Sequence, residues 1–329
     1  MPARNHRRRL QADAGIAGDT IQKSRPCGAM SEGSVLTLRQ GDSELQLFPQ
    51  IGASIARLTW RGHDILRPAP DDAIRDGNVR RMGSFPLLPY SNRIGHGRLL
   101  VNGVTFPLRA NFAPEPHAVH GFGWQRRWQI AESDAVSARL TLQHTPDDDW
   151  PFACEGAQSV SLVNDVVTIN LSLTSRDHRR MPAGLGFHPY FPLTDQLTLQ
   201  TEWLSMWRMN EESLPVGAEK PPADADFARA RAVAGWRIDN CFSGWNRTAL
   251  LDYQTHSVKI NASDNCNHVI CYIPPDGRKF IAVEPVTHVN NALQLRAAGE
   301  KSVDMHWLAP GETMEIAMTL TMRESSAYA

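Results

Sequence analysis

The sequence predicts an all-β protein, an antiparallel β-sandwich or barrel with few short helices. From Ser34 onward, apolar and polar residues alternate with a period of two, which is the pattern of half-buried strands. Turn-forming residues separate these runs at short intervals, and runs with a helical period are rare. Many short strands with almost no long helices are typical of sandwiches and barrels.

The clearest expected strand is Val166–Leu173, in which apolar residues occupy every second position. Asn164-Asp165 separates it from Ser159–Leu162, and this spacing predicts a β-hairpin. The segment from Ala223 to Ala234 is open to two interpretations, a short helix or a loop insert. Further strands are expected at Val35–Leu38, Leu45–Leu47, Ala138–Gln143, Ser257–Ile260, Val269–Ile273, Phe280–Val283 and Glu315–Thr321, with turns at Pro274–Gly277 and Ala309–Glu312.

The chain is expected to hold one domain, from residue 34 to residue 324, without a linker or an internal repeat. Residues 1–33 contain five arginines, four of them within the first nine residues, but no apolar stretch of the secretory type, and we expect a disordered tail there. An arginine-rich targeting segment, or a start codon assigned upstream of Met30, are the alternatives. Residues 325–329 are expected to be a C-terminal tail.

The charge balance argues against large polyanionic partners. The formal net charge is -1, so we expect neither nucleic acid nor an anionic membrane as partner. No run of 18 apolar residues occurs, and no membrane span is predicted. Odd in number and dispersed, the five cysteines favour a reducing cytoplasm over a disulfide scaffold.

Five segments place titrating or hydrogen-bonding groups in an apolar, turn-forming context. They lie far apart in the sequence, so only a large non-local sheet could bring them together. The segments are Pro89–Gly95, His117–Trp124, Gly186–Phe191, Arg237–Phe242 and Val283–His288.

Two of these segments offer a candidate acid and a candidate base. His188 precedes a proline, which favours extended backbone, and aromatic residues surround it in the sequence. An imidazole in such a place can give or take a proton near neutral pH. Glu284 ends an apolar run, where burial of a carboxylate is costly without a partner or a function.

The remaining candidates each have a plain structural interpretation as well. Asn92 and Arg93 could form a hairpin turn, or they could donate hydrogen bonds to sugar hydroxyls. His120 and Trp124 could be core residues; alternatively, the histidine could bind substrate and the indole could cover the apolar face of a sugar ring. Asp239 could initiate a turn or accept hydrogen bonds from two hydroxyls.

A metal centre is the alternative that the histidines raise. His117, His120, His188, Glu284 and His288 could supply ligands. However, residues three apart in a strand point to opposite faces, and no helix is expected near Gly121. We therefore expect no metal, and the family resemblance described next implies no other cofactor.

Taken together, the five segments resemble the aldose 1-epimerase (mutarotase) family. Asn-Arg, His-Gly, His-Pro-Tyr-Phe, a later Asp and Glu-Pro occur in the order of that family, and the resemblance covers about residues 35–322. It implies the galactose mutarotase-like supersandwich, a large antiparallel β-sandwich with an open groove. It also implies that His188 is the general acid, Glu284 the general base, and that Arg93, His120 and Asp239 hold the sugar, with Asn92 beside them. The resemblance assigns no role to His288 or to the 211–235 insert.

The reaction implied by the resemblance is the interconversion of the α and β anomers of a free aldose. A base removes the proton of the C1 hydroxyl while an acid protonates the ring oxygen, and the two groups are expected to approach from different sides of the ring. The expected partner is a monosaccharide, and the expected assembly is a monomer or a weak homodimer.

Two other functions stay open. A hexose-6-phosphate 1-epimerase would need arginines near the phosphate. A non-catalytic carbohydrate-binding protein would not need both His188 and Glu284. The arginines available for a phosphate are Arg80, Arg81, Arg98, Arg126 and Arg127.

Overall fold

The largest sheet has nine strands, and buried residues alternate with less buried ones along its long strands. In the computed structural model, which describes residues 35–325, every second residue of its strand β13 is buried. One apolar face is therefore available for a core, as in a sandwich. The strand order is β10 (Gln129–Ser133), β11 (Ser137–His144), β12 (Cys154–Val163), β13 (Val166–Ser175), β27 (Thr313–Glu324), β23 (His256–Ala262), β22 (Thr248–Asp252), β17 (Thr198–Thr201) and β20 (Arg231–Ala232).

The predicted hairpin joins β12 to β13. Asn164 and Asp165 have φ angles of 50° and 60°, the left-handed backbone that two-residue hairpin turns require. Val163 pairs with Val166, so the register begins directly at the turn. The hairpin prediction is confirmed.

The second large sheet has eight strands, and its strand β25 carries Glu284. All seven residues of β25 are buried, which explains why its sequence is apolar apart from Glu284 instead of alternating. The order is β19 (Pro215–Glu219), β18 (Ser205–Met209), β21 (Ile238–Ser243), β24 (His268–Ile273), β25 (Phe280–Val286), β15 (Gly186–Phe187) and β5 (Pro86–Leu87), with β16 (Tyr190–Pro192) also paired to β25.

Smaller elements complete the described part of the chain. A four-stranded sheet consists of β1 (Leu36–Gln40), β2 (Ser43–Phe48), β3 (Ser54–Trp60) and β4 (His63–Asp64). The two-stranded sheets pair β14 (Met181–Ala183) with β26 (His306–Leu308), β6 (Arg93–Ile94) with β9 (Ala118–Val119), and β7 (Arg98–Val101) with β8 (Val104–Pro107). The helices are α1 (Asp71–Arg75) and α2 (Ala292–Ala297), with single 3₁₀ turns η1 (Val79–Arg81), η2 (Gly95–Gly97), η3 (Gly123–Gln125) and η4 (Ala223–Ala225).

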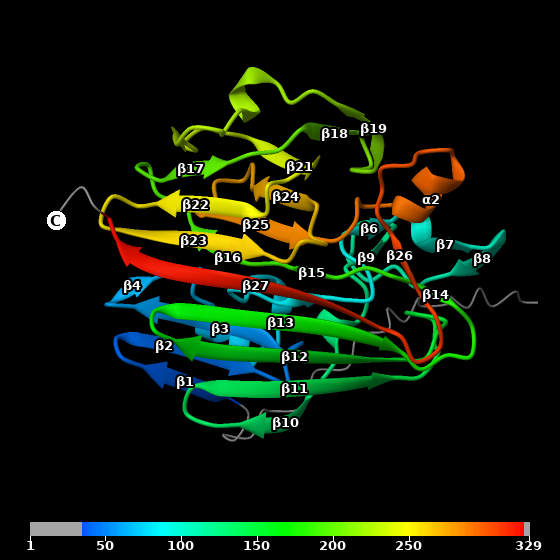
Figure 1. The fold of residues 1–329 in the computed structure, drawn as a ribbon, viewed down its shortest axis with the longest axis horizontal. Coiled ribbons are helices and arrows are strands. Elements are labelled where there is room, and N and C mark those ends of the chain that lie inside the picture. Colours follow the sequence, from blue (N-terminus) through cyan, green and yellow to red (C-terminus); the bar gives the residue numbers. More distant parts are fainter. Residues whose placement is uncertain (1–34, 326–329) are drawn as a thin grey trace, which may run out of the picture.

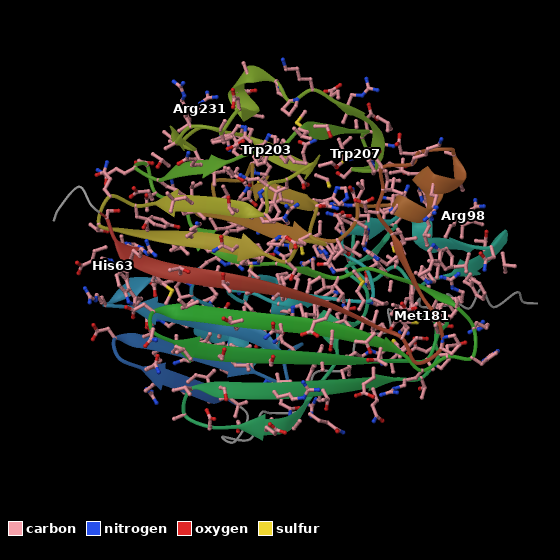
Figure 2. All side chains as sticks on the ribbon, in the orientation of Figure 1. His63, Arg98, Met181, Trp203, Trp207 and Arg231 are labelled. Atoms are coloured by element: carbon pink, nitrogen blue, oxygen red, sulfur yellow. The ribbon has the colours of Figure 1, made fainter. Side chains whose placement is uncertain are left out.

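The sheets pack around a common apolar core. In Figure 1 the nine-stranded sheet runs across the view from β10 at the bottom to β17 near the top, with the blue strands β1 to β4 beside its lower half. The Gln158 amide donates a hydrogen bond to the Ala53 carbonyl (2.9 Å), and the Trp60 indole donates to Asp165 (2.9 Å), which ties the four-stranded sheet to the larger one. Trp203 and Trp207 lie in the upper part of Figure 2, and Trp203 stacks on Phe242 with ring centroids 3.9 Å apart.

The all-β sandwich prediction is confirmed, and the strands expected from the sequence all occur. The helical interpretation of Ala223–Ala234 is wrong: this stretch holds the turn η4 and the strand β20, which pairs with β17. The alternation of Ala with Asp gave no continuous apolar face that could have stabilised a helix.

Some sequence predictions lie at or beyond the limits of the structure. The expected tail at residues 1–33 and residues 326–329 are outside the described range, and the domain boundaries at 34 and 324 stay predictions. No helix of residues 35–325 is long and apolar enough to cross a membrane. Within the same range, Cys154, Cys241, Cys266 and Cys271 are buried free thiols.

Gly121 should be intolerant of a side chain, because it has a φ of +67° and a Cβ atom there would overlap the Leu88 carbonyl. We expect Gly121→Ala to lower the free energy of unfolding by about 1–3 kcal/mol more than Gly103→Ala. Gly103 is a matched control, since its φ is +80° but no atom lies within 4 Å of the added Cβ. Urea denaturation of both variants measures the difference, and equal losses would contradict the overlap.

Candidate functional site

A cavity of about 810 Å³ brings the predicted segments together. Its wall includes six of the seven predicted site residues, although they span almost two hundred positions of the sequence. The six are Asn92, Arg93, His120, His188, Asp239 and Glu284.

Strand register brings His188 and Glu284 into contact. Gly186 of β15 pairs with Val286, and Tyr190 of β16 pairs with Ala282, both on β25. Both flanking strands share this antiparallel register, so His188, midway between them, lies opposite Glu284. The Nε2 atom of His188 is 3.3 Å from Oε1 of Glu284. The two groups are therefore cross-strand neighbours, whereas the sequence analysis expected them to approach the sugar ring from different sides.

Aromatic rings enclose the imidazole of His188. The ring centroids of Phe85 and Tyr190 lie 4.6 Å and 4.4 Å from it, and the ring of His120 meets it edge-on at 5.2 Å. The Tyr190 hydroxyl is 3.3 Å from Nε2, the same nitrogen that faces Glu284. This packing leaves His188 only 6% exposed and fixes its ring plane.

Two buried polar atoms of the pair have no hydrogen-bond partner within residues 35–325. They are Nδ1 of His188 and Oε2 of Glu284. Because most buried polar atoms in proteins are paired, these two are the atoms that a bound hydroxyl group would satisfy.

Burial moves the pKa values of the pair in opposite directions. It raises the pKa of Glu284 well above 4.5, and the nearby Asp239 carboxylate raises it further. It also lowers the pKa of His188 well below 6.5, as do the neighbouring His120 and Arg67. Both shifts favour the neutral forms, so the pair holds one proton between its two members over the intervening pH range.

His120 lies beside the pair as a neutral hydrogen-bond donor. The backbone N–H of Asn92 donates to its Nδ1 (3.1 Å), which leaves the hydrogen on Nε2. Burial, together with the positive charge of Arg93, lowers its pKa to about 3. The imidazole can therefore donate to a hydroxyl without carrying a charge.

Arg93 is held by a carboxylate that the sequence analysis missed. Its Nε and Nη2 donate to the two oxygens of Glu115 at 2.7 Å and 2.9 Å, a bidentate pair. The side-chain oxygen of Asn92 accepts from the backbone N–H and from Nη1 of Arg93. Asn92 thus orients the guanidinium, and its own oxygen is occupied.

Asp239 is part of a strand, not of a turn. It lies on β21 and pairs with Tyr272 of β24, at the cavity wall. The side chain of Asp239 faces the cavity, and the surrounding protein removes part of its hydration. This partial desolvation raises the pKa of its carboxyl. The Arg93 cation opposes that shift, so Asp239 and Arg93 act on each other across the cavity.

Trp124 and His288 do not line this cavity. The Trp124 indole donates to the carbonyls of Val119 and Gly121, and its ring stacks on Phe85 at 5.7 Å. Phe85, on which the Trp124 ring stacks, lines the cavity instead of Trp124. The position of Trp124 therefore gives no support to a direct sugar contact.

His288 has a structural role. Its Nε2 accepts from the backbone N–H of Ser91 (3.0 Å), and its Nδ1 donates to the carbonyl of Val289 (2.8 Å). Burial lowers its pKa to about 4, so it stays neutral. Gly184 packs so closely against this ring that a Cβ there would overlap it.

The histidines do not assemble into a metal centre in the described part of the chain. No group of three or more His, Cys, Asp or Glu residues there could hold a metal ion. His117, one of the residues considered as a ligand, uses both ring nitrogens, with Nε2 near the Glu212 carbonyl (3.0 Å) and Nδ1 accepting from the His96 backbone.

Sequence reasoning missed several residues of the wall. The sequence analysis named Tyr190 only as an aromatic neighbour of His188. The contact of its hydroxyl with the His188 ring is possible because residues two apart in extended backbone point to the same side. Phe85, Phe112 and Tyr272 line the cavity without any local sequence signal.

Comparisons with known proteins agree with this arrangement. A family model described as aldose 1-epimerase matches residues 34–321. A curated protein of Escherichia coli K12, named uncharacterized protein YphB, is 27% identical over 297 residues, which cover 87% of this chain and 98% of that protein.

Solved structures share the fold. An Escherichia coli K12 protein provisionally described as an aldose 1-epimerase superposes with a TM-score of 0.81 at 24% identity and covers 89% of this chain and 99% of its own. A galactose mutarotase-like protein of Clostridium acetobutylicum has a TM-score of 0.79 at 18% identity, covering 88% and 95%. The predicted galactose mutarotase-like β-sandwich is thereby confirmed.

His120 should stay neutral far below the usual pH of histidine protonation. Its pKa of about 3 lies below the ordinary 6.5, so its contribution to stability is complete above pH 6.5 and is lost as the pH falls toward 3. Nitrogen and carbon NMR shifts of the ring should show the Nε2–H tautomer throughout this fall. Titration of His120 near 6.5 in the folded protein would contradict the assignment, and the urea-unfolded chain is the control.

Proposed function

Because the chain belongs to the aldose 1-epimerase family, we propose that it interconverts the α and β anomers of an aldose through acid–base opening and closure of the ring. The observation that carries the proposal is the 3.3 Å contact between His188 and Glu284 on the wall of the cavity. Both groups titrate, and each keeps one polar atom unpaired.

The chemistry needs a neighbouring acid and base. Glu284 takes the proton of the C1 hydroxyl, and His188 gives a proton to the ring oxygen as the bond from C1 to that oxygen breaks. The open aldehyde rotates about its C1–C2 bond, and closure from the other face reverses the proton transfers. Because the C1 hydroxyl and the ring oxygen share the same carbon, adjacent side chains can serve both.

The proton count of the pair suits this cycle. Before ring opening the pair holds one proton, on His188. After ring opening it again holds one proton, on Glu284. Burial favours the neutral arrangement with the proton on Glu284, and hydrogen bonds from sugar hydroxyls to the carboxylate favour the charged one. Opposed preferences of this kind make the two arrangements close in free energy, which a reversible reaction requires.

The other wall residues are assigned to substrate binding. Arg93 and the Nε2–H of His120 donate hydrogen bonds to the sugar, and Asp239 accepts them from hydroxyls. Asn92 orients Arg93 through its side-chain oxygen. In place of Trp124, the rings of Phe85 and Tyr272 offer apolar surface to the sugar.

The two alternatives differ in what they require of the cavity. A non-catalytic binding protein does not need the buried acid–base pair, whose desolvation is costly. A 6-phosphate substrate needs cations at the wall, and Arg80 and Arg81 are there. Arg98, Arg126 and Arg127 are not among the lining residues, and Figure 2 shows Arg98, the first residue of β7, on the right-hand side of the molecule.

Substitution of either member of the pair should abolish most turnover. Glu284→Gln and His188→Asn each remove one proton transfer, so we expect kcat to fall by about 10²–10⁴-fold. Polarimetric relaxation of fresh α-glucose and α-galactose, with the spontaneous rate subtracted, measures the loss.

Exposed positions supply matched controls for these variants. Glu315→Gln on β27 and His178→Asn should keep the wild-type rate, because both side chains are exposed and neither lines the cavity. Near-normal turnover in a folded Glu284→Gln or His188→Asn protein would refute the proposed roles. A wild type that is inactive on common hexoses and pentoses, and also on hexose 6-phosphates and glucuronate, would favour the binding-protein alternative.

The pH profile of kcat/KM should be a plateau with two limbs. When the pair that holds one proton takes up a second one, that proton binds to His188. The lowered pKa of His188 therefore places the acid limb below pH 6.5. Loss of the shared proton is opposed by the raised pKa of Glu284, so the alkaline limb lies well above 4.5. NMR anomer exchange across pH, with circular dichroism to confirm folding, measures both limbs. An acid limb at or above 6.5 would contradict the shift.

A further inference from the structure

The cavity has an excess of positively charged residues. Five arginines line it, against the three carboxylates of Glu115, Asp239 and Glu284. The chain as a whole has a formal net charge of -1, so this excess is local to the cavity. Four of the arginines form a group that we call the arginine rim: Arg80, Arg81, Arg237 and Arg278.

Two guanidinium groups of the rim have protein carboxylates as partners. Arg81 pairs with Asp72 at 2.6 Å, and Arg278 pairs with Asp276 at 2.8 Å. The fifth arginine of the cavity, Arg93, is held by Glu115 as described above.

Arg80 and Arg237 have no carboxylate within 4.0 Å among residues 35–325. Arg80 lies over the ring of Phe112, with its guanidinium carbon 4.5 Å from the ring centroid. Arg237 has a long contact of 3.5 Å from Nη1 to the Pro275 carbonyl. Neither contact uses the planar fork of donors that makes arginine suited to oxyanions.

Positive charges also repel one another at the rim. The half-buried Arg67 is hydrogen-bonded to this part of the chain, because its Nη2 donates to the carbonyls of Arg80 and Met82. Its pKa is lowered to about 10, chiefly by burial and further by the charges of Arg278 and Arg81. Cations gathered in this way at a cavity attract anionic ligands and bind them by charge-assisted hydrogen bonds.

The free donors belong to the substrate cavity but not to its acid–base pair. Neither Arg80 nor Arg237 is a hydrogen-bond or ion-pair partner of His188 or Glu284. A volume of about 810 Å³ leaves room for a substituent beyond a single sugar ring. We infer that the aldose acted on here carries an oxyanion, a carboxylate or a phosphate, which Arg80 and Arg237 bind. This inference rests on the proposed epimerase function.

Three sugars with one ring configuration test the inference: glucose, glucuronate and glucose 6-phosphate. We expect kcat/KM for at least one of the two anionic sugars to exceed that for glucose by about tenfold or more. The glucuronate and phosphate arms tell which oxyanion is bound. Added salt should raise KM for the anionic sugar and leave KM for glucose nearly constant, because only the charged pair is screened.

Variants of the unpaired arginines locate the effect. The double variant Arg80→Met/Arg237→Met should lower the ratio of anionic to neutral kcat/KM by about 10–100-fold. Arg80→Lys/Arg237→Lys keeps the charge and should retain part of the preference. Arg139→Met, on the exposed side of β11, is the matched control and should leave the ratio unchanged.

Failure of this inference is distinct from failure of the proposed function. Turnover of glucose with no anion preference, or a ratio unaffected in the double methionine variant, overturns the inference and leaves the epimerase proposal standing. If no sugar is turned over, the epimerase proposal fails and calorimetric binding decides the inference. Tighter binding of glucuronate or glucose 6-phosphate than of glucose, lost in the double variant, would support it, and equal binding would overturn it.

Discussion

The pairing of two short strands with one central strand is the constraint on which the candidate site depends. β15 and β16 both pair with β25 in a single register, and the two residues between them, His188 and Pro189, bridge the break. Because Pro189 has no backbone N–H, the ladder is interrupted there without leaving a donor unpaired. That interruption sets His188 opposite Glu284, and a shift of one residue would turn one of the two side chains to the other face of the sheet.

The same register buries a titratable pair at the wall of the cavity. Burial of an ion pair costs more than its attraction returns unless further hydrogen bonds compensate. Around His188 the neighbours are mainly rings, and within residues 35–325 the Tyr190 hydroxyl is the one polar group, besides Glu284, found at Nε2. The surroundings therefore favour neutral partners, and a polar ligand is what could shift the proton from the carboxyl to the imidazole.

The sequence was most informative where a local rule applies. Alternation and the Asn164-Asp165 turn predicted β12, β13 and their hairpin, because side-chain period and turn geometry are properties of consecutive residues. His188 and Glu284 stood out because polar groups inside apolar runs next to proline are unusual, and the family resemblance then paired them.

What the sequence left out depends on contacts between distant segments. Nothing near Glu115 indicates that it holds Arg93, since the pairing is made across the cavity wall by the folded chain. Trp124 has the composition of a sugar-stacking residue, but the packing places Phe85 between it and the reacting pair. Likewise, no local pattern separates the unpaired Arg80 from the paired Arg81 beside it.

The imidazole of His288 links the two halves of the cavity wall. On one side it holds the backbone of Ser91, next to the residues that orient Arg93, and on the other it follows β25, the strand of Glu284. Its ring fills the space beside Gly184, which has no room for a larger residue. Positions 184 and 288 should therefore covary among relatives: a smaller residue in place of the histidine would permit a side chain opposite it, and the ring at 288 would always accompany glycine at 184.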